Sequence, residues 1–197
     1  MTATAELFRR RGYHGTGLKD VTAAAGATTG SLYHFFPGGK ADLAAAVITE
    51  TGAVYQQLFE VIADEHGDPA NGVRAMFDGA AVALEDVDFV DICPIGTVAG
   101  EVASTDERLR RAADDVFMGW TGAAAARFRA AGLPARPARE LATTVVAALQ
   151  GAILHARCRR DAAPLRTTGA LMAELVAARV ATATVGRSRR SADRAHR

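Results

Sequence analysis

Residues able to hydrogen-bond to nucleic acid are concentrated in a short stretch near the N-terminus. Within positions 28–40 the chain offers hydroxyls, an imidazole and an ammonium group, carried by Thr28, Thr29, Ser31, Tyr33, His34 and Lys40. Hydroxyl groups bond to base edges and phosphate oxygens, and ammonium groups pair with phosphate. Gly30 lies among them and has no side chain, which lets the backbone approach a partner closely. This set predicts contact with DNA, although Tyr33 taken alone is equally compatible with a half-buried packing aromatic.

Two short helices joined by a tight turn are expected to position these side chains. In the first, small and apolar residues recur with the spacing of one helical face, at Leu18, Val21, Thr22 and Ala25. Thr16 is the expected N-cap of that helix and a further candidate DNA-binding residue, and Thr28 is the expected N-cap of the second. Gly26 supplies the turn between them. This layout is that of a helix-turn-helix, whose second helix enters the DNA major groove.

The remainder of the chain is also expected to be helical. Alanine is abundant and there are only 6 prolines, which favours helix. The expected helices cover residues 2–11, 41–66, 70–84, 95–103, 107–131, 138–160 and 165–184, with a loop at 85–94. We therefore predict an all-α chain of about nine helices, with a helix-turn-helix DNA-binding domain over residues 1–40 and a helical ligand-binding and dimerisation domain over residues 41–184. Residues 185–197 are rich in Arg and poor in apolar residues, which predicts a basic disordered tail.

Charge is distributed unevenly along a chain whose net charge is only +1. Residues 1–40 carry five Lys or Arg against two acidic residues, and residues 187–197 carry five Arg against one Asp. The stretch between them is acidic. Basic ends around an acidic body fit a protein whose N-terminal part meets phosphate.

Composition argues against secretion, membrane insertion and disulfide cross-linking. No signal-peptide pattern is present, and no apolar run reaches the roughly 18 residues that a membrane span needs. Cys93 and Cys158 are far apart and lack the CxxC spacing of a metal or redox site. We expect a cytoplasmic protein with no metal, no other cofactor and no membrane partner.

The N-terminal part resembles the DNA-binding domain of the tetracycline-repressor (TetR) family. Residues 12–16, 25–26 and 30–40 carry the resemblance and read GYHGT, AG and GSLYHFFPGGK. Residues 93–96, which read CPIG, together with Glu101 are similar to the LmrA/YxaF-like branch of the family. The resemblance implies a homodimer paired through its eighth and ninth helices and a pseudo-palindromic operator in double-stranded DNA. It also implies a pocket for a small-molecule effector among the fourth to eighth helices.

Two features depart from the family pattern. Phe35 stands where relatives often have a His that touches phosphate. The first helix also lacks the one or two turns and the basic arm that relatives have before the segment at residues 5–8. If the reading frame extends upstream with a Thr/Arg-rich turn, the regulator hypothesis is strengthened. If Met1 is the true start, the alternative is a helical small-molecule-binding protein with a truncated, non-regulatory head.

Candidate effector-binding residues are spread over the expected body helices and the 85–94 loop. Pockets for drug-like molecules are mostly apolar, with a few placed polar groups. Large or polar residues at suitable positions are Met76, Phe77, Phe89, Ile92, Cys93, Glu101, Phe117, Trp120 and His155. Each is also compatible with a structural role: Met76, Phe77 and Phe117 with core packing, and His155 with a hydrogen-bonded core or interface position.

Enzymatic function finds little support in the motifs. The chain lacks the GxSxG nucleophile elbow, the GxxxxGK[ST] phosphate loop and the HExxH metal motif. The adjacent carboxylates of Asp114 and Asp115 point in different directions on a helix and do not form a catalytic pair. We therefore predict a ligand-responsive transcriptional regulator, a repressor that a small apolar effector releases from its operator.

Overall fold

The computed structural model describes the backbone of residues 1–90 and 93–195, and the side chains of residues 1–90 and 93–184. Over those ranges the chain forms nine α-helices and no strand. They are α1 (Thr2–Arg11), α2 (Leu18–Ala25), α3 (Thr29–Phe35), α4 (Lys40–His66), α5 (Pro69–Asp86), α6 (Pro94–Val102), α7 (Glu107–Ala130), α8 (Ala135–Arg159) and α9 (Ala163–Ala195). The predicted all-α fold is confirmed.

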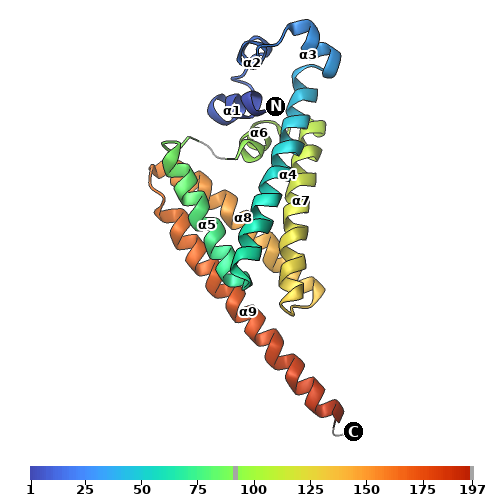
Figure 1. Ribbon diagram of the computed structural model, residues 1–197, viewed down its shortest axis with the longest axis vertical. Helices are drawn as coiled ribbons and strands as arrows, with labels where there is room; N and C mark the ends of the chain where they lie inside the picture. The colour runs from blue at the N-terminus through green and yellow to red at the C-terminus, as the bar shows by residue number, and fades with distance from the viewer. Residues whose placement is uncertain (91–92, 196–197) are drawn as a thin grey trace.

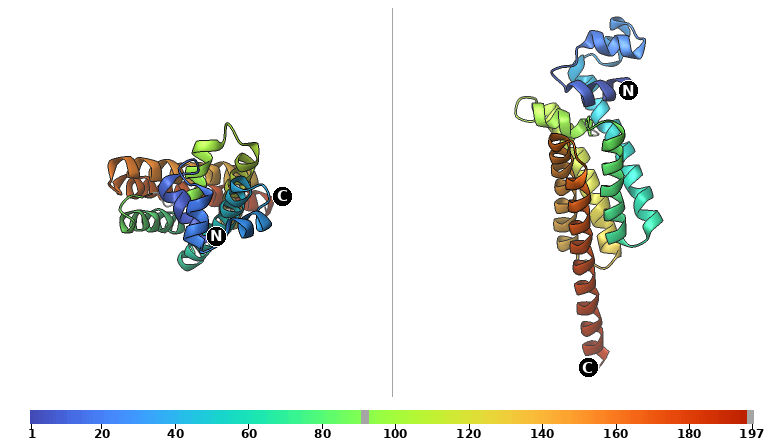
Figure 2. Two further views of the ribbon diagram at one scale, coloured as in Figure 1. Left: turned by 90° about the horizontal axis from the view of Figure 1, so that it is seen from above. Right: turned by 90° about the vertical axis from the view of Figure 1, so that its left-hand side faces the viewer.

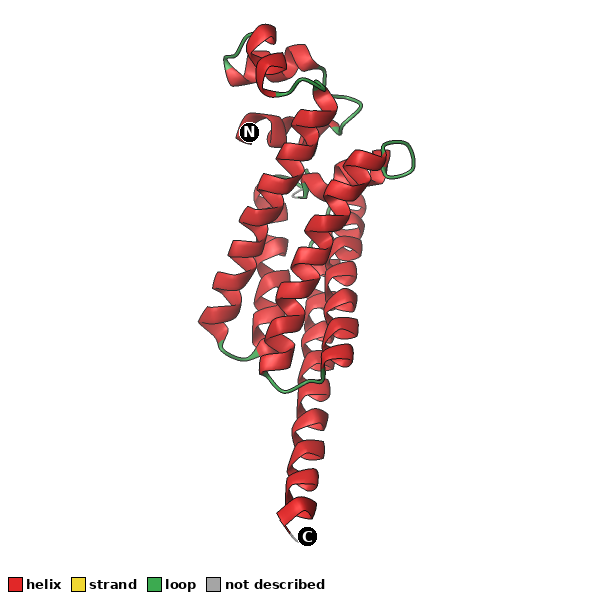
Figure 3. Cartoon of the chain, turned by 90° about the vertical axis from the view of Figure 1, so that its right-hand side faces the viewer, coloured by secondary structure: helices red, strands yellow, loops and turns green. Residues whose placement is uncertain are grey.

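A small head and a long helical body lie end to end (Figure 1). The head consists of α1, α2 and α3, and α4 leaves it to run along the body beside α7. On the other side of the body α5 packs against α9, and α8 packs against both α7 and α9. The last turns of α9 project beyond the rest of the bundle (Figure 2). Mostly short loops join the helices (Figure 3).

Local sequence signals end and begin the head helices. Gly12 follows α1 with a φ of 73°, and Gly26 follows α2 with a φ of 61°. Both values lie in the left-handed region that glycine adopts without steric cost. The hydroxyl of Thr28 accepts a hydrogen bond from the backbone N–H of Ser31 at 3.1 Å, which confirms Thr28 as the N-cap of α3.

The predicted role of Thr16 as the N-cap of α2 is wrong. Gly17 precedes that helix, and its N–H donates to the carboxylate of Asp20 at 3.0 Å. Thr16 is instead fully buried, and its hydroxyl donates to the carbonyl oxygen of Gly12 at 2.8 Å. Because the hydroxyl of this side chain is buried and hydrogen-bonded within the head, it stabilises the loop between α1 and α2 and does not face a DNA surface.

Two helix boundaries in the body differ from the sequence expectation by three residues or more. α8 begins at Ala135 and contains Pro137, because a proline in the first turn removes only an N–H that has no partner within the helix. The predicted disordered tail is also corrected for residues 185–195, whose backbone is helical in α9, while residues 196 and 197 lie outside the described residues. Arg and Ala are good helix formers, and extending an existing helix avoids the cost of nucleation.

Buried side chains form two clusters, one of which joins the head to the body. The first includes Phe77 and Phe128 and lies between α5, α7, α8 and α9. The second contains Phe8 and Leu32 of the head together with Val98 of α6. Three short helices are too small to hold a sufficient core of their own. The attachment of the head to the body therefore depends on its contacts with α4 and α6.

α8 is long and apolar enough, by length and composition, to cross a membrane. In this fold it packs against α5, α7 and α9, and its Leu141, Val145 and Ile153 side chains are buried in the protein. The core helix of a helical bundle meets the same criterion. α8 is therefore weak evidence for membrane insertion.

Candidate DNA-binding surface and effector cavity

The outer face of α3 carries most of the predicted DNA-contacting residues. Buried Leu32 fixes the helix to the head core. Around it Thr28, Thr29, Gly30 and His34 are exposed, Ser31 is half-buried and Tyr33 is 48% exposed. Phe35 is 70% exposed, an unusual state for a phenyl ring, and its ring lies 5.1 Å from that of His34. The helix thus presents small hydroxyl-bearing residues at one end and aromatic rings at the other.

Lys40 lies at the first position of α4 and links that helix to the loop after α1. Its ammonium group lies 4.4 Å from the centroid of the Tyr13 ring, which is a cation–π contact. Burial lowers the pKa of Lys40 from its ordinary value, while the nearby charge of Glu101 acts in the opposite direction. The side chain is half-buried. A phosphate at this position would therefore share the ammonium group with the Tyr13 ring.

Glu101, a predicted effector-binding residue, instead faces the head. Its carboxylate accepts hydrogen bonds from the backbone N–H groups of Tyr13 and His14, both at 2.9 Å. Gly12 makes this approach possible, because a Cβ added there would lie 2.0 Å from a carboxylate oxygen of Glu101. A single side chain of α6 therefore holds the turn that follows α1.

An apolar cavity of about 410 Å³ lies in the body between α4, α5, α7 and α8. Its wall is mainly aliphatic and aromatic and includes Tyr55, Phe59, Ile62, Met76, Leu149 and Ile153. Leu58, Gly79 and Ala83 also line it and are exposed, which places its mouth between α4 and α5. A cavity of this size and composition suits a drug-sized, mostly apolar molecule.

Three of the predicted effector-binding residues lie on this wall, namely Met76, Cys93 and Trp120. Cys93 is also the N-cap of α6, and its sulfur accepts the N–H of Gly96 at 3.4 Å. The indole N–H of Trp120 donates to the carbonyl oxygen of Gly52 at 2.9 Å, which joins α7 to α4 beside the cavity.

The other predicted effector-binding residues lie elsewhere, and Ile92 falls outside the described residues. Phe77 is fully buried on the opposite side of α5, against α9 at Gly169. Phe117 packs edge-on against Trp120 in the second core cluster, at 5.5 Å between ring centroids.

Phe89 and His155 are likewise absent from the cavity wall. Phe89 packs against the first core cluster, with the guanidinium of Arg160 5.8 Å from its ring. His155 is exposed on the outer side of α8. For both residues, the direction in which the backbone points the side chain determines whether it reaches the cavity. The residue type alone does not indicate this direction.

Sequence reasoning missed the α4 wall of the cavity and the amide of Gln150. Tyr55, Phe59 and Ile62 recur at intervals of four and three residues, a helical stripe that was visible in the sequence. Gln150 is the side-chain amide on the α8 wall. Its position within an otherwise apolar stretch of α8 was the available signal.

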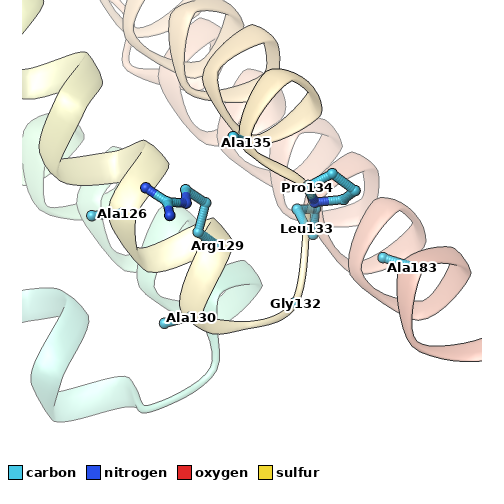
Figure 4. Close-up of a pocket in the computed structure, with 8 residues that line it drawn as sticks. All are labelled: Ala126, Arg129, Ala130, Gly132, Leu133, Pro134, Ala135 and Ala183. Atoms are coloured by element: carbon cyan, nitrogen blue, oxygen red, sulfur yellow. The ribbon is translucent and has the colours of Figure 1, made fainter. Parts of the chain in front are cut away.

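A second hollow lies at the turn between α7 and α8 (Figure 4). It is an open depression lined mainly by alanines and the turn backbone, with Arg129 at one side and Ala183 of α9 at the other. It offers a ligand little burial. Among the described residues, no group of three or more His, Cys, Asp or Glu side chains comes together to hold a metal ion.

The outer faces of α8 and α9 carry exposed apolar side chains. Leu154 of α8 is 58% exposed and Leu171 of α9 is 56% exposed. The small residues Gly151 and Ala178 are exposed on the same two helices. On α8 the helical stripe of Leu141, Val145, Ala148 and Ala152 faces mainly the core. On α9 the stripe of Leu171, Leu175, Ala178 and Thr182 is mostly exposed.

Two family descriptions match the chain. Residues 1–47 match the bacterial regulatory proteins of the tetR family. Residues 69–171 match the C-terminal domain described as transcriptional regulator LmrA/YxaF-like. The first match contains the whole helix-turn-helix, and the second contains α5 to α8 and the start of α9.

Relatives with similar sequences cover most of the chain. YxaF of Bacillus subtilis, described as an uncharacterized HTH-type transcriptional regulator, is 33% identical over 159 residues, which cover 81% of this chain and 83% of that protein. The HTH-type transcriptional regulator LmrA of the same organism is 30% identical, and the match covers 84% and 88%. Among solved structures, the regulatory protein TetR from Rhodobacter sphaeroides aligns with a TM-score of 0.77 at 25% identity, covering 88% of this chain and 94% of that chain.

Proposed function

Because the chain belongs to the TetR family of bacterial regulatory proteins, we propose that it is a repressor released from its operator by a small, mostly apolar effector. Proteins of this family are DNA-binding transcriptional regulators rather than enzymes. The observation that carries the proposal is the arrangement around α6. One end of this helix borders the apolar cavity through Cys93, and the other end holds the head through Glu101.

The proposed DNA contacts are those of the exposed face of α3. Thr29 and Ser31 would meet base edges in the major groove, while Tyr33 and His34 would contact the backbone. Lys40 would add a phosphate contact next to the N-terminus of α4. Phe35 extends this surface with an exposed ring, which cannot hydrogen-bond to a phosphate.

The proposed homodimer pairs through α8 and α9. Leu154 and Leu171 leave apolar area on the outer faces of these helices, and small neighbours permit close helix contact. The two heads would then place their α3 helices in successive major grooves, about 34–36 Å apart on a pseudo-palindromic operator. We infer that the protein acts in the cytoplasm, where it meets chromosomal DNA.

Effector binding would act by changing the separation of the two heads. A ligand shifts a conformational equilibrium only if it binds the two states with different affinity. Since Cys93 both lines the cavity and caps α6, an occupant contacts the helix that orients the head. A displacement of α6 would move the turn at Tyr13 and His14, and with it α3.

Fluorescence anisotropy with DNA from the region upstream of the gene tests the proposal. Scrambled DNA of equal length is the control, and the titration is repeated over a salt series. We expect a preference of roughly a thousandfold or more for the natural sequence, with a salt dependence that reflects several phosphate contacts. Weak binding without preference would contradict the proposal and favour a ligand-binding protein with a non-regulatory head.

A further inference from the structure

Gln150 is a polar side chain on the wall of an otherwise mainly apolar cavity. Within the described part of the chain its amide forms no hydrogen bond. Gln150 is half-buried, and the part of its amide that is removed from water loses free energy unless a partner replaces the lost hydrogen bonds. The amide can both donate and accept, so it can pair with a hydroxyl, a carbonyl or a similar neutral group.

Gln150 lies where the cavity borders α6. The amide oxygen lies close to α6, because a Cβ added at Gly96 would be 2.8 Å from it. Cys93, the N-cap of α6, lines the same cavity. A ligand group that bonds to Gln150 therefore lies next to the first turn of α6.

Electrostatics restricts the charge of the occupant. Among the described residues that line the cavity there is no Asp, Glu, Lys, Arg or His. A charged ligand group would lose its hydration there without gaining an ionic partner. A neutral ligand with a large apolar part avoids this cost and gains from contact with the aliphatic and aromatic wall.

We propose that the effector is a neutral, mostly apolar small molecule bearing one hydrogen-bonding group, and that Gln150 selects it by bonding to that group. This inference rests on the proposed function, because it takes the cavity as the effector site. It adds the chemical class of the effector, the residue that determines specificity and the part of the cavity where the polar group binds.

A displacement assay with N-phenyl-1-naphthylamine, a neutral apolar fluorophore, tests the class of ligand. Trp120 is the only tryptophan of the chain and lines the cavity, so energy transfer from it reports that the fluorophore binds close to the cavity. Three competitors share one ring system: 2-naphthol, 2-methylnaphthalene and 2-naphthoate. We expect 2-naphthol to displace the fluorophore at a concentration roughly fivefold lower than 2-methylnaphthalene, as one net hydrogen bond implies, and 2-naphthoate to be the weakest.

Gln150→Leu tests the selecting residue. It keeps the size of the side chain but removes the amide, so 2-naphthol and 2-methylnaphthalene should compete equally. Gln150→Met provides the same test if the leucine variant does not fold, as judged by its thermal unfolding curve. Gln56→Leu is the matched control, since the Gln56 amide bonds to Glu60 and does not line the cavity, and it should preserve the preference.

Several results would overturn the inference. In the natural protein, these results are the absence of energy transfer from Trp120, equal competition by 2-naphthol and 2-methylnaphthalene, or 2-naphthoate as the strongest competitor. In the Gln150→Leu variant, the contradicting result is a preference for 2-naphthol that persists without the amide. None of these measurements involves DNA. Selective operator binding without selective displacement would overturn the effector class alone, whereas selective displacement without operator binding would overturn the regulator.

Discussion

Replacing Glu101 by Gln tests whether α6 controls the orientation of the DNA-binding head. The carboxylate accepts the N–H groups of Tyr13 and His14 at 2.9 Å each. A carboxamide of the same shape has only one oxygen, so one N–H would face the NH₂ group and lose its acceptor. The substitution removes one charge-assisted hydrogen bond and weakens the other.

The expected magnitude follows from these two bonds. A hydrogen bond to a charged group contributes about 1.5–3 kcal/mol, and the half-buried position of Glu101 lets water replace part of the loss. We therefore expect the free energy of opening the turn to fall by about 1–2 kcal/mol. This corresponds to a roughly 5- to 30-fold increase in the equilibrium constant for opening. A looser turn should also reduce operator affinity, because the position of α3 becomes less defined.

Hydrogen exchange measured by NMR at the Tyr13 and His14 amides gives the direct readout, and anisotropy gives the operator affinity. Glu140→Gln is the control, because Glu140 is an exposed residue of α8 that pairs with Arg136 on its own helix. The Glu140→Gln substitution removes one negative charge, as Glu101→Gln does, but at a site remote from the head. If exchange at the two amides is the same in both variants, Glu101 does not hold the turn and the proposed route through α6 is wrong.

Three further predictions concern the DNA surface, the core and the dimer. Tyr33→Phe or Lys40→Ala should weaken operator binding without dissociating the dimer in sedimentation, and loss of Lys40 should lower the salt slope by about one. In a denaturant titration, Gly169→Ala should reduce the free energy of unfolding by about 1–3 kcal/mol, because its Cβ would lie 2.5 Å from an α5 side chain. Gly122 has open space around it, so Gly122→Ala should cause no loss of stability in the same titration. Leu171→Glu should convert the dimer to monomers in sedimentation and lower operator affinity, and a dimer of undiminished stability would exclude this face from the interface.

The head could be predicted from the sequence because its signals are local. A glycine that needs positive φ ends α1 at Gly12 and α2 at Gly26, and a hydroxyl at Thr28 begins α3. Each of these signals acts within four residues. Thr16 marks the limit of this reasoning, since a threonine near a helix start serves equally well as a cap or as a buried hydrogen-bond donor, and only packing decides between them.

The cavity could not be predicted to the same extent, because its wall depends on how each helix is rotated. Met76 lines the cavity, whereas the next residue, Phe77, points about 100° around α5 and is buried against α9. The sequence marks both as apolar residues of one helix. Glu101 is a stronger case, since its hydrogen-bonding partner Tyr13 lies 88 positions earlier and nothing near it in the sequence indicates that contact.

α6 holds the head by two kinds of contact, and they have different consequences for the Glu101→Gln variant. The carboxylate fixes the turn after α1, while Val98 of α6 belongs to the same apolar cluster as Phe8 of α1 and Val21 of α2. Apolar burial is not directional, so it keeps the head attached without fixing its angle. Loss of the carboxylate should therefore speed exchange at the turn but leave the amides of the α1 and α2 core protected. Equal loss of protection throughout the head would instead mean that Glu101 supports the stability of the whole domain, and lower operator affinity would then be no evidence for signalling through α6.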